Sequence, residues 1–233
     1  MTTLHHLATS VHGRYLVRGP GGSAPLLVGF HGYAEDAARH LQALDRIPGV
    51  ERWRRVAVDA LHPFYERKTG EVVGSWMTRR DRELAIADNL RYVGRVVEAA
   101  RGDGDGSSGE RPLVFAGFSQ GVAMAFRAAA GAGHPCHGLI VNGGDVPPEL
   151  AAAEGLALPP VLLGRGRRDE WYPAAQAERD VALLRSRAIP VRCVVFDGGH
   201  EWAAEFAQAA GQFLAAVLEA PGATSRGSGA KAG

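Results

Sequence analysis

Ser119 is the residue whose surroundings most clearly suggest chemistry. It stands at the centre of the segment GFSQG, residues 117–121, which has the form G-x-S-x-G. An apolar run over 113–116 precedes this segment, and a helix-like stretch over 122–130 follows it. In that context, small residues on either side of a serine permit a strained turn that raises the hydroxyl above a sheet, an arrangement called a nucleophile elbow. Ser119 is therefore the candidate nucleophile of an acyl-transfer reaction, and the alternative is a glycine turn with an exposed serine.

A serine hydroxyl is a weak nucleophile at neutral pH, so Ser119 needs a general base. The chain has nine histidines, and His200 has the most suitable position. It lies in the glycine-rich turn DGGHE, residues 197–201, after the apolar run over 191–196 and ahead of the last helix-like stretch. Catalytic groups commonly gather where strands end. We therefore predict that His200 is the base.

The base in turn needs an acid that holds its ring in one orientation. Asp169 follows the apolar run over 161–163, and Asp145 follows the run before that. Both give the chain order Ser, Asp, His that is typical of α/β-hydrolases. We favour Asp169, because the acid must hold the imidazole from an adjacent turn. Asp145 is the alternative acid, and Glu170 is a third choice.

Acyl transfer also needs donors for the negative charge that develops on the carbonyl oxygen. The backbone N–H of Gln120, which follows the nucleophile, is one such donor. The segment HGY at 31–33 comes directly after an apolar run, and the N–H of Tyr33 is placed to be the second. The alternative for this segment is a strand-to-helix turn capped by Glu35 or Asp36, and the two interpretations are compatible.

The elements that must position these residues alternate between apolar runs and helix-like stretches. Continuous apolar runs, as expected of strands buried on both faces of a parallel sheet, occur at 25–30, 55–60, 112–117, 138–142, 160–164 and 191–196. Helical periodicity occurs at 82–101, 174–187 and 201–220. This pattern predicts an α/β fold with a mostly parallel, doubly wound sheet and helices on both faces, preceded by a short strand around 13–18.

The boundaries of the domain follow from composition. We predict a single domain over 1–220, with a flexible glycine-rich loop at 102–109 and a disordered tail over 221–233. The segment over 61–74 predicts a small hairpin at the rim of the site. Only a short loop separates residues 142 and 159, which leaves no room for a large cap domain.

Composition excludes several classes of function. A net charge of +1 gives no general attraction to nucleic acid or to an anionic membrane, and no run approaches the ~20 apolar residues of a membrane span. The two cysteines, Cys136 and Cys193, are predicted to be small buried apolar residues in a reducing compartment, which favours the cytoplasm. His134, Cys136 and His137 lack a second ligand cluster, so no metal is predicted. No phosphate-binding or dinucleotide-binding motif occurs, so no cofactor is predicted.

Five segments, taken in order, resemble the phospholipase/carboxylesterase family of α/β-hydrolases, which includes small carboxylesterases and acyl-protein thioesterases. They are Phe30-His31-Gly32, Ser75-Trp76, GFSQG at 117–121, Gly166-Arg167-Arg168-Asp169 and Gly199-His200. The resemblance covers residues from about Leu26 to Phe213. It implies Ser119, Asp169 and His200 as a catalytic triad and the amides of Tyr33 and Gln120 as an oxyanion hole. It also implies a tryptophan, Trp76, beside the substrate.

We assign His31, Trp76 and Phe118 to the predicted substrate-binding residues. The sequence departs from the family where Ala34 and Glu35 replace a glycine and an aspartate. It departs again at Met77-Thr78, where the family has a phenylalanine and an aspartate, and at Glu170, where proline is usual. These changes leave the chemistry intact and bear on substrate preference.

The expected function is that of a cofactor-free serine hydrolase. It would cleave carboxylic esters or thioesters of small or short-acyl substrates through an acyl-enzyme. The alternatives are a peptidase or amidase on the same scaffold, and a non-catalytic protein that holds a small ligand. The expected partner is a small-molecule ester or thioester rather than nucleic acid, with a homodimer left open.

Overall fold

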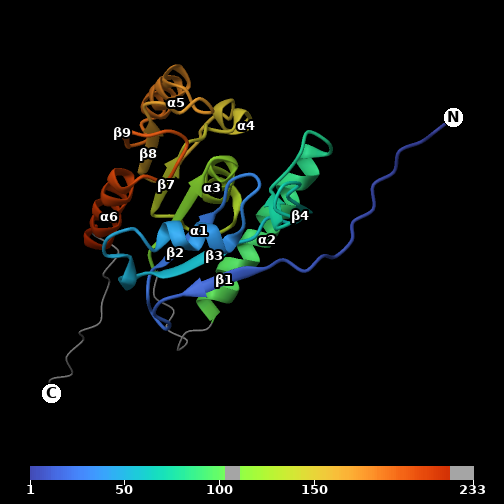
Figure 1. Cartoon of the computed structure of the whole chain (residues 1–233), viewed down its shortest axis with the longest axis horizontal. Helices are drawn as coiled ribbons and strands as arrows, with labels where there is room; N and C mark the ends of the chain where they lie inside the picture. The colour runs from blue at the N-terminus through green and yellow to red at the C-terminus, as the bar shows by residue number, and fades with distance from the viewer. Residues whose placement is uncertain (103–110, 221–233) are drawn as a thin grey trace.

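The computed structural model describes residues 1–102 and 111–220, and seven of its strands form one sheet (Figure 1). Their order across the sheet is β1-β3-β2-β6-β7-β8-β9. The strands are β1 (Tyr15–Arg18), β2 (Leu26–Phe30), β3 (Arg54–Val58), β6 (Leu113–Phe118), β7 (Gly138–Asn142), β8 (Val161–Gly166) and β9 (Val191–Phe196). All neighbours pair in parallel except β1, which is antiparallel to β3. The predicted fold class is confirmed.

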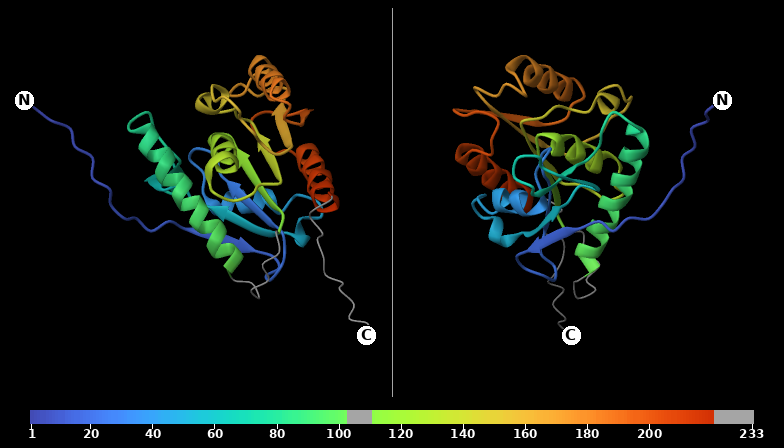
Figure 2. Two further views of the ribbon diagram at one scale, coloured as in Figure 1. Left: turned by 180° about the vertical axis from the view of Figure 1, so that it is seen from behind. Right: turned by 45° about the vertical axis from the view of Figure 1, so that its right-hand side comes forward.

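Helices cover both faces of this sheet (Figure 2). They are α1 (Ala37–Leu44), α2 (Arg82–Gly102), α3 (Gln120–Gly131), α4 (Pro148–Ala151), α5 (Ala174–Ser186) and α6 (Ala204–Glu219), with a short 3-10 helix, η1 (Val50–Arg52). Apolar residues of α2, α3 and α5 pack on one face, and those of α1, η1 and α6 pack on the other. The central strands between them, such as β2, β6 and β7, are therefore shielded from water on both sides.

Strand β6 illustrates why continuous apolar runs form the centre of this fold. Leu113 and Phe115 point into the core beneath α2 and α3, while Val114 and Ala116 point into the core beneath α6. Successive side chains of a strand face opposite sides, so both sides of a central strand must be apolar. Burying each large side chain contributes about 1.5–3 kcal/mol relative to leaving it exposed.

A two-stranded hairpin stands apart from the main sheet, as predicted for residues 61–74. Its strands, β4 (His62–Tyr65) and β5 (Val72–Ser75), pair in antiparallel fashion. An isolated bridge between Glu35 and Gly74 attaches the hairpin to the loop after β2. The hairpin therefore lies next to the segment that carries the predicted oxyanion donor.

The prediction of a fully buried last strand is wrong. β9 is at the edge of the sheet and pairs only with β8, so Arg192, Cys193 and Val195 are exposed. Cys193 is thus not a buried residue, and Cys136 is only partly buried. Whether a strand lies at the edge depends on the order of strands in the sheet, and this order cannot be inferred from the apolar pattern of a single strand.

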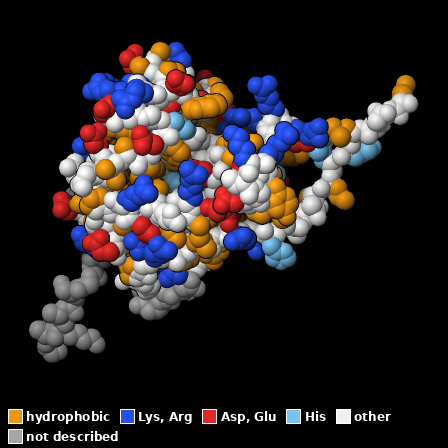
Figure 3. All heavy atoms as spheres, in the orientation of Figure 1, with side chains coloured by type: hydrophobic (Ala, Val, Ile, Leu, Met, Phe, Trp, Pro, Cys, Tyr) orange, Lys and Arg blue, Asp and Glu red, His pale blue; other side chains and the backbone are white. Residues whose placement is uncertain are grey.

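Some predictions fall on residues that the structure does not describe. Apart from Gly102, the last residue of α2, the proposed loop and the tail over 221–233 lie outside the described residues. The single domain over 1–220 stays a prediction. Within 1–102 and 111–220, no helix is both long enough and apolar enough to cross a bilayer. Basic and acidic side chains are interspersed over the face in Figure 3.

Candidate active site

Ser119 occupies a sharp turn between β6 and α3. Its backbone has φ 52° and ψ −120°, a conformation that is costly for a residue with a side chain and that stores about 1–3 kcal/mol of strain. Both flanking residues must be glycines, because there is no room for a Cβ at either position. A Cβ on Gly117 would lie 2.4 Å from the carbonyl oxygen of Gly121, and one on Gly121 would lie 2.0 Å from that of Phe30. The chain therefore forms the turn that the G-x-S-x-G pattern predicts.

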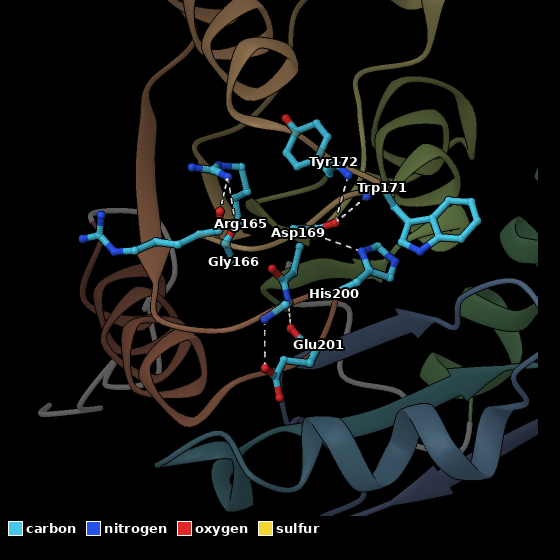
Figure 4. A network of polar contacts seen from close by, with 10 residues as sticks. Arg165, Gly166, Asp169, Trp171, Tyr172, His200 and Glu201 are labelled. Carbon is cyan, nitrogen blue, oxygen red and sulfur yellow. Dashed lines mark hydrogen bonds and ion pairs between the residues drawn. The ribbon is translucent and has the colours of Figure 1, made fainter.

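His200 and Asp169 form a hydrogen-bonded pair at the ends of β9 and β8 (Figure 4). His200 Nδ1 lies 2.9 Å from Asp169 Oδ2. Because an ionised carboxylate only accepts hydrogen bonds, Nδ1 carries the proton and Nε2 keeps its lone pair. The other carboxylate oxygen, Oδ1, accepts hydrogen bonds from the backbone N–H groups of Trp171 and Tyr172, both at 2.9 Å. Asp169 is thereby fixed in one orientation.

Contacts of Phe118 and of the end of β7 link Ser119 to the His200–Asp169 pair. The ring of Phe118, the residue before Ser119, packs against the His200 imidazole with centroids 4.8 Å apart and the ring planes tilted by 36°. The N–H of Ser119 donates to the carbonyl oxygen of Asn142 at 3.0 Å. On the next residue, Gly143, a Cβ would come within 2.9 Å of His200 Cε1. The turn after β7 thus contacts both the serine and the histidine.

The alternative acids have different surroundings. Asp145 and Glu170 are both exposed, whereas the Asp169 side chain is only 1% accessible to solvent. The hydrogen bond to His200 comes from Asp169. Asp169 is therefore the acid that the geometry brings to the histidine.

The loop after β2 passes beside the serine. A Cβ on Gly32 would lie 3.3 Å from that of Ser119, and the Gly32 N–H donates to Glu35 Oε2 at 2.9 Å. Among the described residues, the N–H groups of Tyr33 and Gln120 have no hydrogen-bond partner. Gln120 begins α3, so its amide is at the positive end of the helix dipole. Both amides are available to an incoming oxygen.

His31 is not a substrate contact, contrary to our prediction, because its side chain is fully buried. Its Nε2 accepts a hydrogen bond from the Ala60 N–H at 3.0 Å, so Nδ1 donates to the Gly32 carbonyl oxygen at 2.7 Å. Burial lowers the pKa of His31 below its ordinary value, which keeps the ring neutral. His31 therefore fixes the loop beside the serine.

Trp76 is likewise a structural residue rather than a wall of the site. It is fully buried, packs edge-to-face on Phe30 and donates from Nε1 to the His31 carbonyl oxygen at 2.9 Å. The side chain of Gln120, which sequence reasoning missed, accepts a hydrogen bond from the Trp76 N–H at 3.0 Å and donates to the Met77 carbonyl oxygen at 3.1 Å. These bonds tie the loop after β5 to the serine turn.

Aromatic side chains lie in the loop after β2, in the hairpin predicted over 61–74 and in the turn after β8. Tyr33 is 60% exposed and stacks on Phe64 of the hairpin, with centroids 5.4 Å apart. Trp171 is 83% exposed, and its indole lies beside His200 in Figure 4. Phe64 belongs to the hairpin that the sequence predicts, whereas nothing in the local sequence distinguishes Trp171 from a core residue, because its exposure depends on the turn after β8.

This geometry agrees with a comparison against known protein families. A family model described as phospholipase/carboxylesterase matches residues 70–218. The chain belongs to this family. This description names hydrolases of the esterase class. The match covers the elements that carry Ser119, Asp169 and His200. A search of the curated proteins finds no match.

Solved structures with the same fold include three enzymes. Esterase PE8 is 26% identical with a TM-score of 0.63, over 88% of this chain and 98% of its own. Acyl-protein thioesterase 2 of Zea mays is 18% identical with a TM-score of 0.68, over 89% and 100% of the two chains. A Bacillus cereus carboxylesterase is 15% identical with a TM-score of 0.67, over 88% and 94%. The last two likenesses support the fold alone.

Proposed function

We propose that this family member is a serine hydrolase that cleaves carboxylic esters or thioesters of small or short-acyl substrates. The observation that carries the proposal is the His200–Asp169 pair, whose fixed tautomer leaves Nε2 free to accept a proton beside the strained serine turn. A binding protein would have no use for a carboxylate anchored in this way. Membership of an esterase family supports the same conclusion.

In the proposed reaction, Ser119 Oγ attacks the substrate carbonyl carbon while His200 Nε2 takes its proton. The N–H groups of Tyr33 and Gln120 stabilise the negative charge on the carbonyl oxygen. His200 returns the proton to the departing alcohol or thiol, which leaves an acyl group on the serine. Water then attacks this acyl-enzyme in the same way, and the serine is regenerated. Asp169 stabilises the imidazolium that forms in each half of the reaction.

The surroundings of the serine support small or short-acyl substrates. Only the four-residue helix α4 interrupts the connection between β7 and β8, so nothing of domain size covers the site from that connection. The aromatic side chains of Tyr33, Phe64 and Trp171 provide apolar walls at its rim. Such walls bind acyl or aromatic groups without a deep tunnel.

The test combines labelling with turnover. We expect a fluorophosphonate probe to label the protein and p-nitrophenyl esters to be hydrolysed, with rates that fall as the acyl chain lengthens. Ser119→Ala removes both signals, while Ser186→Ala, which changes a serine at the end of α5, leaves both intact. Labelling that persists in Ser119→Ala would contradict the proposal, as would the absence of ester hydrolysis by folded protein.

A further inference from the structure

A pocket of about 270 Å³ opens beside His200, between α1 and the turn that precedes α6. Phe118, His200 and Trp202 form one side of it. Arg39, Gln42 and Arg46 form the other side, and their spacing of three and four residues puts them along one side of α1 and its continuation. A substrate whose carbonyl carbon is at Ser119 can therefore extend past His200 into a pocket with polar walls.

The pocket wall contains two arginines and two glutamates, so an anion would be held by the guanidinium N–H groups that these glutamates leave unpaired. Arg46 is exposed and has no ion-pair partner among the described residues. Arg39 is paired through Nε with Glu35 at 3.2 Å, but Glu35 also accepts the Gly32 N–H. The other carboxylate in the wall, that of Glu201, accepts a hydrogen bond from the Gly199 N–H at 3.1 Å. Glu35 is thus paired with Arg39, and the arginine of this wall without an ion-pair partner among the described residues is Arg46.

The apolar side of the pocket also contains an unused donor. Trp202 is 8% exposed, and its Nε1 has no hydrogen-bond partner within the described ranges. An indole N–H can only donate, so a buried one without an acceptor is costly. Burial lowers the pKa of the neighbouring His40 to about 3, so this ring contributes no positive charge of its own. Among the described residues, Trp202 Nε1 and His40 Nε2 have no hydrogen-bond partner, and neither do the guanidinium of Arg46 and the terminal N–H groups of Arg39.

We propose that this pocket selects esters that bear a carboxylate, which Arg39 and Arg46 hold while the ester carbonyl is at Ser119. The proposal rests on the proposed function, since it assigns a substrate class to the same site. The carboxylate can belong to the acyl part or to the alcohol part of the ester. The chemistry of recognition is the same in both cases, so the experiment includes both.

The experiment compares each ester that bears a free carboxylate with the same ester in which an uncharged carboxamide replaces that carboxylate. Monomethyl adipate against its monoamide tests the acyl part, and 4-acetoxybenzoate against 4-acetoxybenzamide tests the alcohol part. We expect kcat/KM to be about 10-fold higher for the carboxylate in at least one pair, because two exposed arginines that each contribute about 0.7 kcal/mol together have roughly this effect. The preference should fall as salt is raised, because the arginines are accessible to ions.

Variants then assign the preference to the pocket. Arg46→Gln and Arg39→Gln should each reduce kcat/KM for the ester that bears the carboxylate about 3-fold and leave that for the carboxamide nearly unchanged. The matched control is Arg95→Gln, an exposed arginine of α2 on the opposite face of the sheet, which should change neither.

The two proposals fail in different ways. Equal rates for carboxylate and carboxamide esters in the wild type, or a preference that survives both arginine substitutions, would overturn the pocket assignment and leave the hydrolase intact. Failure of folded protein to hydrolyse any of the four esters or p-nitrophenyl acetate would instead overturn the proposed function. Circular dichroism establishes that each variant is folded.

Discussion

Replacing Asp169 by asparagine tests the proposed chemistry most directly, because the two side chains have nearly the same shape. Asp169 Oδ1 accepts two backbone N–H groups, and Oδ2 accepts the proton of His200 Nδ1. An asparagine has one oxygen and one NH₂ group to put in these two places. Its orientation therefore decides what happens to the histidine.

The backbone donors determine that orientation. If the asparagine NH₂ group faced the N–H groups of Trp171 and Tyr172, two buried donors would be left unpaired at a cost of about 1–3 kcal/mol each. The amide oxygen must therefore take the place of Oδ1, which turns the NH₂ group toward His200. The imidazole then accepts at Nδ1, and its proton moves to Nε2, the atom that has to receive the serine proton.

The expected loss of activity follows from this tautomer. Catalysis would require the disfavoured tautomer, and a penalty of about 4–5.5 kcal/mol corresponds to a reduction of roughly 10³–10⁴-fold in kcat. The backbone fold should change little, because the two hydrogen bonds to the new amide oxygen remain. We expect the substrate KM to stay within about 3-fold, since Asp169 is buried and does not reach the substrate.

The assay is steady-state hydrolysis of p-nitrophenyl acetate by purified wild type, Asp169→Asn and Asp145→Asn. Asp145 is exposed, so its variant is the matched control and should keep nearly full activity. Urea denaturation measures whether the free energy of unfolding has changed. More than a tenth of wild-type kcat in Asp169→Asn, or loss of activity in Asp145→Asn, would refute the reasoning.

Three other substitutions test the turns and the buried histidine. Ser119→Gly should abolish turnover. It should also have a free energy of unfolding about 1 kcal/mol higher than that of Ser119→Ala, because glycine tolerates a φ of 52°. Equal free energies of unfolding for the two variants in urea denaturation would contradict strain at Ser119. Gly143→Ala should reduce kcat at least ~10-fold, since its Cβ would crowd His200. The control is Gly133→Ala, at φ +77° in open space, which should only lower the free energy of unfolding by about 1 kcal/mol. Equal kcat values for these two variants would count against the crowding. Burial lowers the pKa of His40 to about 3, so this ring stays neutral in the folded protein, while the same histidine in the unfolded chain takes up a proton below pH 6.5. The free energy of unfolding should therefore fall by about 2–3 kcal/mol between pH 6.5 and 4.5. His40→Leu should flatten that dependence in pH-resolved denaturation, and an unchanged slope would be inconsistent with this account.

The sheet could be predicted because its strands are buried on both faces. The centre of a strand such as β7 (Gly138–Asn142) must be apolar on both faces, which makes residues 139–141 a continuous apolar run with recognisable ends. The error at β9 has the same origin, because its sequence resembles a buried strand. Its exposure follows from the absence of a strand beyond it in the described sheet, a property of topology that no local pattern contains.

The candidate catalytic residues could also be predicted, because each lies in its own turn directly after a strand. Ser119, Asp169 and His200 follow β6, β8 and β9, and parallel strands bring their carboxyl ends to one edge of the sheet. The roles of His31 and Trp76 could not be inferred in this way. They depend on hydrogen bonds to residues 29 and 45 positions apart along the chain, which appear only in the folded molecule.

The buried positions of His31 and Trp76 determine where substrate selectivity can arise. Together with the Gln120 side chain, they form a hydrogen-bonded path from the loop after β5 to the loop beside the serine. A substitution in that path would displace the amide of Tyr33 and reduce turnover of every substrate alike. Discrimination between substrates must therefore reside in side chains that reach solvent, namely the aromatic rim and the arginines along α1. A substitution that changes kcat equally for all esters thus indicates an effect on the buried hydrogen-bonded path. One whose effect depends on the ester indicates an effect on the exposed side chains.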